Sequence, residues 1–123
     1  MIRSRIDDEF GSFVRERREE LRASDETYSV RQVAARIGVE PAYLSKIERG
    51  EVSPPGEETI RKLAAELEED ADVLLAMAGK VSSDLKEIIR RRPKLFAELL
   101  RQLKNAPNHA VLRIARQVRD GDW

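Results

Sequence analysis

Hydrophobic residues recur every three or four positions along nearly the whole chain, which is the spacing of helices that bury one face. No segment alternates hydrophobic and polar residues as a half-buried strand does. The pattern predicts a first helix over residues 8–23, with Phe10, Val14 and Leu21 on its buried side, followed by a polar connection. The chain is therefore predicted to be all-α.

Two short helices joined by a tight turn are predicted after this connection. Ser29 and Gln32 have the spacing of a capping box, so Ser29 is expected to begin the first of the two helices. Gly38 is expected to end that helix, because the residue after a helix often takes a left-handed backbone conformation. Pro41 is expected at the first position of the next helix, where its missing N–H costs nothing, and Gly50 is expected to end it.

Two more helices are predicted before residue 80, with buried positions at Ile60, Leu63, Ala64, Leu67, Leu74, Leu75 and Met77. After residue 80, three short amphipathic helices follow, separated by breaks at Pro93 and Pro107. Each is too short to be stable alone in water, so their apolar stripes must pack on the first domain, on each other or on a second chain. We expect one domain over residues 1–80 and a helical extension over residues 81–123.

Composition narrows the possible chemistry. The absence of cysteine excludes disulfides, thiolate zinc sites, iron–sulfur clusters and cysteine nucleophiles. The single histidine, His109, leaves little for histidine-based catalysis, and the acidic cluster of residues 66–70 is expected to be solvated surface. We therefore expect no enzyme activity, cofactor or metal. The first nine residues lack the apolar core of a signal peptide, so the expected location is the cytoplasm.

The charges balance overall, with 23 basic and 23 acidic residues, but they are unevenly distributed. Residues 51–81 carry three basic and eight acidic side chains, a net charge of −5, whereas residues 82–123 carry ten basic and five acidic, a net charge of +5. Arg90, Arg91, Arg92 and Lys94 are either contacts to DNA or a solvated helix end. Trp123 either frays, as termini usually do, or anchors a partner.

The second helix of the predicted pair has an outward face suited to nucleic acid. Ala42, Ser45, Lys46 and Arg49 are spaced i, i+3, i+4 and i+7, so they share one side of the helix. This side carries small, polar and basic residues and no acid. Such a helix fits the major groove, where a lysine can donate to guanine and a methyl group can contact thymine.

The stretch from Phe10 to Gly79 resembles the Xre / lambda-repressor-like helix-turn-helix family. The residues that carry the resemblance are Ser29, Gln32, Val33, Ala34, Gly38, Tyr43, Leu44, Ser45, Ile47, Glu48 and Gly50. It implies a five-helix domain that binds operator DNA, usually as a dimer, with residues 41–49 as the recognition helix. By this resemblance the residues that face base edges are Pro41, Ala42, Ser45 and Lys46. Those near phosphates are Arg31, Gln32, Tyr43 and Arg49.

The sequence departs from the family pattern at several points. Glu40 and Ala42 stand where serine is frequent. Glu40 suits the positive end of a helix but repels phosphate, and Ala42 cannot donate a hydrogen bond, which leaves base readout mainly to Lys46. The connection after the first helix is also longer than usual. Family-matched positions also place Arg18 and Glu48 in an ion pair between the first and third helices. An acid directed at DNA would be repelled, so an internal partner for Glu48 is physically reasonable.

These observations predict a sequence-specific DNA-binding transcriptional regulator, a dimeric repressor that reads an inverted repeat in double-stranded DNA. In this version the residues after position 80 dimerise or brace the domain. The alternative is an antitoxin-like or zinc-peptidase-controlled repressor, in which the C-terminal region binds a toxin or is cleaved by a peptidase.

Overall fold

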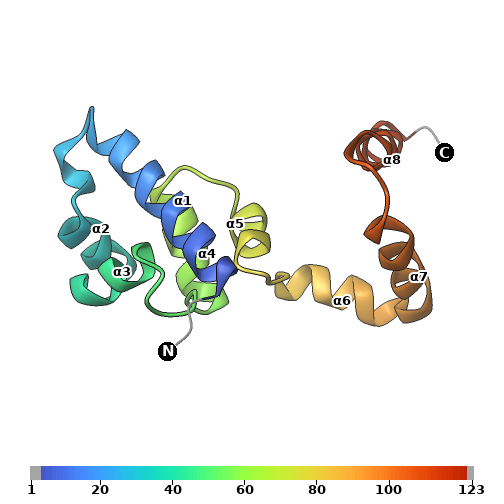
Figure 1. Cartoon of the computed structure of the whole chain (residues 1–123), viewed down its shortest axis with the longest axis horizontal. Coiled ribbons are helices and arrows are strands. Elements are labelled where there is room, and N and C mark those ends of the chain that lie inside the picture. The colour runs from blue at the N-terminus through green and yellow to red at the C-terminus, as the bar shows by residue number, and fades with distance from the viewer. Residues whose placement is uncertain (1–3, 122–123) are drawn as a thin grey trace. The chain divides into compact units, whose positions relative to one another are not determined.

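The computed structural model describes residues 4–121 as helices and connecting loops, without a strand among them (Figure 1). This confirms the all-α prediction. The chain divides into two compact units, Met1–Ser82 and Ser83–Trp123, which are described separately below. Within the described residues, the structure contains no helix with both the length and the apolar character needed to cross a membrane.

The first unit contains five α-helices and one 3-10 turn: α1 (Arg5–Arg22), η1 (Glu26–Tyr28), α2 (Val30–Ile37), α3 (Pro41–Glu48), α4 (Glu57–Glu66) and α5 (Ala71–Met77). Helix α1 begins three residues before the predicted start. The reason is a cap, because the hydroxyl of Ser4 accepts a hydrogen bond from the backbone N–H of Asp7 at 3.1 Å. Asp70 caps α5 in the same way, because its side chain accepts hydrogen bonds from the N–H groups of Asp72 and Val73.

The signals predicted around α2 and α3 are confirmed. The hydroxyl of Ser29 accepts from the backbone N–H of Gln32 at 3.2 Å and lies 2.9 Å from its side-chain oxygen. Gly38 ends α2 with a φ of 76°, a left-handed conformation that a side chain would disfavour. Pro41 is the first residue of α3, and Gly50 follows the helix with a φ of 71°.

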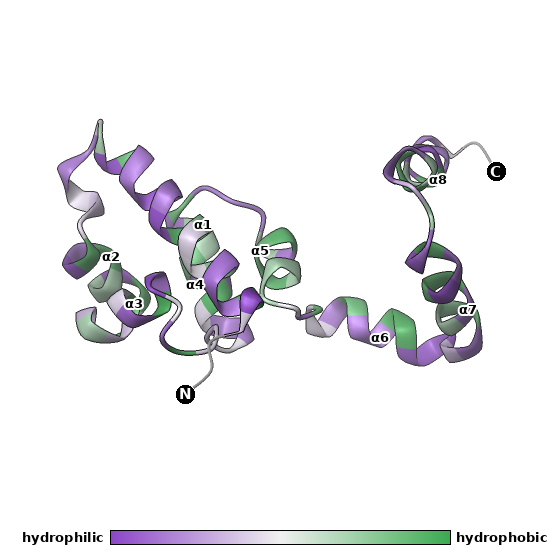
Figure 2. Cartoon of the chain, in the orientation of Figure 1, coloured by the Kyte–Doolittle hydropathy of each residue, from purple (hydrophilic) through white to green (hydrophobic). Residues whose placement is uncertain are grey.

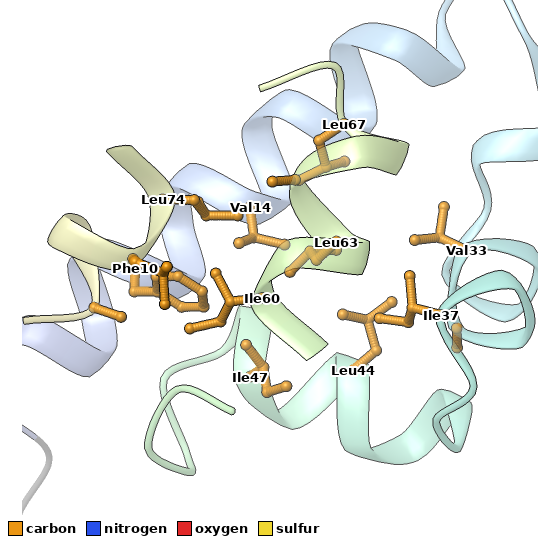
Figure 3. Packing of buried hydrophobic residues seen from close by; sticks show 14 residues of the cluster. Phe10, Val14, Val33, Ile37, Leu44, Ile47, Ile60, Leu63, Leu67 and Leu74 are labelled. Atoms are coloured by element: carbon orange, nitrogen blue, oxygen red, sulfur yellow. The ribbon is translucent and has the colours of Figure 1, made fainter. Parts of the chain in front are cut away.

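A single hydrophobic core joins the five helices of the first unit (Figure 3). Leu44 and Ile47 of α3 are at most 1% exposed, and they meet side chains of α1, α2 and α4. The other large buried side chains are Phe10, Val14, Val33, Ile37, Ile60, Leu63, Leu67, Leu74 and Leu75. Because burial of such a side chain contributes roughly 1.5–3 kcal/mol, the inner side of α3 is firmly held and its outer side has a fixed direction.

Helix α1 lies unusually close to α3 at Gly11. A Cβ atom added at this glycine would overlap the carbonyl oxygen of Ile47 and would lie 2.8 Å from that of Glu48. Only a residue without a side chain allows this approach. The close packing brings the middle of α1 alongside the end of α3.

The second unit consists of α6 (Ser83–Arg91), α7 (Pro93–Lys104) and α8 (Asn108–Asp120), separated at the predicted proline breaks. Helix α6 contacts α7. Hydrophobic and hydrophilic residues follow one another along each helix, as Figure 2 shows. Among the described residues of this unit, none is buried, and Phe96 is half-buried. The large hydrophobic side chains between 41% and 67% exposed are Leu85, Ile88, Leu95, Leu99, Leu100, Leu112, Ile114 and Val118.

Candidate DNA-binding surface

The outer side of α3 presents the residues that the resemblance assigned to base contacts. Ala42 and Lys46 are exposed, and Pro41 and Ser45 are half-buried. Leu44 and the other core residues of α3 are on the opposite side. The result is a short helix with a fixed orientation, a cationic side chain and small neighbours that leave room for base edges.

The residues assigned to phosphate contacts occupy three different environments. Arg31 and Gln32 are exposed in the first turn of α2, and Gln32 is tied to its capping serine. Tyr43 is half-buried and packs against the hydrophobic core, so its ring also braces α3. Arg49 is exposed just after α3.

Arg49 is held by a neighbouring acid. Its guanidinium group donates to Glu51 through Nε at 2.9 Å and through Nη2 at 3.2 Å. These hydrogen bonds raise the pKa of Arg49 above its ordinary value. A phosphate contact by Arg49 would have to share its donors with this carboxylate or displace it.

The predicted ion pair between α1 and α3 is confirmed, and it turns Glu48 away from the exposed side of α3. Arg18 donates to the two carboxylate oxygens of Glu48 at 2.7 and 2.9 Å, and both side chains are 4% exposed. Arg18 also donates to the carbonyl oxygen of Tyr28 at 3.0 Å. Hydrogen bonding to Glu48 raises the pKa of Arg18, although burial acts in the opposite direction.

The acidic cluster at the end of α4 is engaged in ion pairs within the first unit. Glu66 accepts from Nε of Arg36 at 2.6 Å, and Glu69 lies 3.1 Å from Nε of Arg17. Arg17 also donates to the carbonyl oxygen of Leu67 at 3.0 Å. Among the residues that the structure describes, no group of His, Asp and Glu could hold a metal ion.

The cationic residues of the second unit are exposed. Arg90 and Arg91 each lie 3.8 Å from a carboxylate oxygen of Glu87, a distance typical of a loose surface pair. Both interpretations of this cluster, DNA contact and solvated helix end, stay open. His109 lies exposed in the first turn of α8, as predicted, and Trp123 lies outside the described residues.

Sequence reasoning missed Arg15, an exposed residue on α1 that faces the end of α3. The sequence gives no indication that Arg15 lies beside α3, because the hydrophobic pattern shows only which side of α1 is apolar. The nearby Gly11 is the one available signal, since a glycine inside a helix often marks a close backbone approach.

Comparison with known proteins identifies the family. A family model described as a helix-turn-helix domain matches residues 9–76. Two curated relatives from two strains of Mycobacterium tuberculosis, each described as an uncharacterized HTH-type transcriptional regulator, are 39% identical over 69 residues. That match covers 56% of this chain and 45% of each relative, so the chain matches somewhat less than half of their length. No solved structure gives a significant match. The chain therefore belongs to the helix-turn-helix family that its residues from Ser29 to Gly50 resemble.

Proposed function

We propose that this protein is a sequence-specific DNA-binding transcriptional regulator that places α3 in the major groove. One observation carries the proposal: α3 is locked into the core on one side and offers Lys46 to solvent on the other. The acid of this helix, Glu48, is neutralised internally by Arg18. Within α3 itself the exposed side therefore carries no carboxylate, whereas Glu40, exposed at the N-cap, would repel a phosphate placed at the start of the helix.

Selection of bound fragments from random DNA, followed by affinity measurements on the selected site, tests this proposal. Lys46→Ala should relax base preference and weaken binding to the selected site by about 1–3 kcal/mol. Lys62→Ala is the matched control, because Lys62 is an exposed lysine on α4, outside the proposed surface. Unchanged site preference and affinity in Lys46→Ala would refute the assignment of this lysine to base readout.

We further propose that the regulator is a repressor that acts as a dimer through the second unit. One helix-turn-helix unit reads few base pairs, and two-fold dimers increase specificity by reading two half-sites about one helical turn apart. Helices α6, α7 and α8 have 9, 12 and 13 residues. Helices of this length need packing to be stable, and a second copy would cover their exposed apolar faces.

Truncation after Ser82 tests the role of the second unit. This position is the boundary between the two compact units, so the fragment keeps the whole of the first unit. We expect the fragment to stay folded, to be monomeric by light scattering, and to lose most of its affinity for an inverted repeat while it keeps weak binding to a half-site. A full-length protein that is monomeric at micromolar concentration, and binds a two-site DNA as a single copy, would refute the dimer.

A different partner for the second unit is favoured by its charge. The net charge of +5 over residues 82–123 opposes self-association and suits an acidic protein surface. In this version the protein is an antitoxin-like or zinc-peptidase-controlled repressor, and the second unit is the binding or cleavage segment. A monomeric full-length protein in the light-scattering experiment would favour this version over the dimer.

A further inference from the structure

A hollow of about 250 Å³ lies beside the recognition helix, where α1, α2 and α3 meet. Its walls include the buried Arg18–Glu48 pair and the residues Arg15, Val30 and Ser45, together with Arg49 just after α3. Its volume is several times the roughly 30 Å³ that a water molecule occupies in the liquid. The hollow is open to solvent, and its lining includes Ser45, the residue next to Lys46 in α3.

One cationic side chain of this hollow is available to bind an anion. Arg18 and Glu48 neutralise each other, and Glu19, which also lines the hollow, accepts a hydrogen bond from Arg18 at 3.0 Å. Arg15 is exposed, and no carboxylate pairs with it within the part of the chain that the structure describes. Arg49, on another wall, is already hydrogen-bonded to Glu51, so Arg15 is the cation of the lining whose donors remain available to an anion.

The donor groups have the chemistry that binds phosphate. The guanidinium of Arg15 can donate two parallel hydrogen bonds to a phosphate group, and the hydroxyl of Ser45 can donate a third. The resemblance assigned Ser45 to base contacts, so a phosphate in this hollow would lie at the edge of that surface and would use the Ser45 hydroxyl for positioning. A contact here would fix how α3 sits in the groove without reading sequence itself.

We propose that the hollow binds a backbone phosphate of the DNA and that Arg15 is its ligand from α1. The inference rests on the proposed DNA-binding function and extends it. One phosphate would contact both α1 and the end of α3. Gly11 supports this arrangement indirectly, because the close approach of the two helices at that residue brings Arg15 within reach of the recognition helix.

The test compares the full-length Arg15→Gln variant with the parent protein on the selected site and on an unrelated duplex, between 50 and 200 mM salt. Loss of one phosphate contact should make the plot of log affinity against log salt less steep by about 0.9. The affinity deficit of the variant should therefore shrink about threefold over this salt range. Both effects should be the same on the two DNAs. Lys62→Gln, which removes one charge from an exposed site on α4, should leave the slope unchanged.

The outcomes separate the two proposals. A parent protein that binds no DNA would refute the proposed function and this inference together. If the parent binds and Arg15→Gln keeps its affinity and salt slope, only the phosphate site is refuted. A loss confined to the selected site would assign Arg15 to base contact, and an equal loss in Lys62→Gln would reduce the effect to overall charge; either result overturns the phosphate site. Equal melting temperatures of parent and variant establish that both are folded.

Discussion

Removal of the Glu48 carboxylate would leave one cation stranded inside the first unit. In Glu48→Ala, the guanidinium of Arg18 loses the two hydrogen bonds of 2.7 and 2.9 Å but stays in a site where its side chain is 4% exposed. The carbonyl oxygen of Tyr28 and the carboxylate of Glu19, each 3.0 Å away, remain as acceptors. The variant should therefore be destabilised mainly by an incompletely compensated buried charge.

The expected cost follows from this geometry. Breaking a buried pair by removing one partner costs about 3–5 kcal/mol, and the two remaining acceptors of Arg18 place Glu48→Ala near the lower end. For a unit of 82 residues, about 3 kcal/mol corresponds to a fall in melting temperature of roughly 12–24 °C. Urea unfolding of the full chain, followed by circular dichroism, measures the free energy of unfolding directly.

A double variant tests whether the instability of Glu48→Ala comes from the loss of the ion pair or from the buried charge that is left without a partner. Arg18→Met with Glu48→Leu replaces both ions by apolar side chains, an exchange that is often neutral or stabilising. It should recover most of the stability that Glu48→Ala loses. DNA binding by Glu48→Ala should fall only in proportion to the unfolded fraction. A fully stable Glu48→Ala protein that cannot bind DNA would refute the structural role and make Glu48 part of the DNA-binding surface.

Two further predictions concern the first unit. Gly11→Ala should destabilise it more than a usual surface change, because the new methyl group would overlap the carbonyl oxygen of Ile47; a melting temperature equal to the parent's would show that α1 can move aside. Hydrogen bonds from Thr27 lower the pKa of Asp25, so this residue stabilises the fold above the ordinary carboxyl pKa of about 3.9. That contribution should be lost as the pH falls through the lower folded-state pKa, and melting curves of Asp25→Asn should lack this part of the acid response.

The sequence contains good information about where helices begin and end, because caps are local. Ser29, Gly38 and Pro41 each act through their own backbone or a residue three positions away, so their roles could be predicted without a fold. Helix α1 begins earlier than predicted because Ser4 caps it, and Ile6, four residues before Phe10, already continues the helical spacing toward that cap.

The candidate site was predictable only as far as it lies on one helix. The spacing of Ala42, Ser45 and Lys46 puts them on one side of α3 in any fold that contains this helix. The hollow lined by Arg15 depends instead on the angle and distance between α1 and α3, which side-chain packing determines. The Arg18–Glu48 pair was predicted only because the family resemblance supplied that tertiary relation.

Neither the sequence nor the structure identifies the partner of the second unit. The hydrophobic pattern indicates that the apolar faces of α6, α7 and α8 must be covered, but it does not indicate by what. The eight exposed large hydrophobic side chains of this unit would each contribute roughly 1.5–3 kcal/mol on full burial. Because these side chains are about half exposed, each has about half of that energy still to gain. Covering all eight on both chains of a dimer would contribute about 12–24 kcal/mol to the free energy of association. Association costs an estimated 4–15 kcal/mol before side-chain ordering and polar desolvation. The apolar contribution is therefore of the same order as the cost of association, so the proposed dimer needs most of these side chains to be covered.

Salt distinguishes the apolar and charged contributions to that dimer. Two copies of a segment with a net charge of +5 repel each other, and at 0.1 M salt this repulsion is screened beyond about 10 Å. Added salt weakens the repulsion and leaves the apolar contact intact, so the dimer should tighten between 50 and 500 mM salt. DNA affinity should fall over the same range as counterions compete for the phosphates. Sedimentation equilibrium measures the first effect and titration of labelled DNA the second. Dissociation of the dimer at high salt would mean that ion pairs, and not the apolar faces of α6 to α8, hold the two copies together.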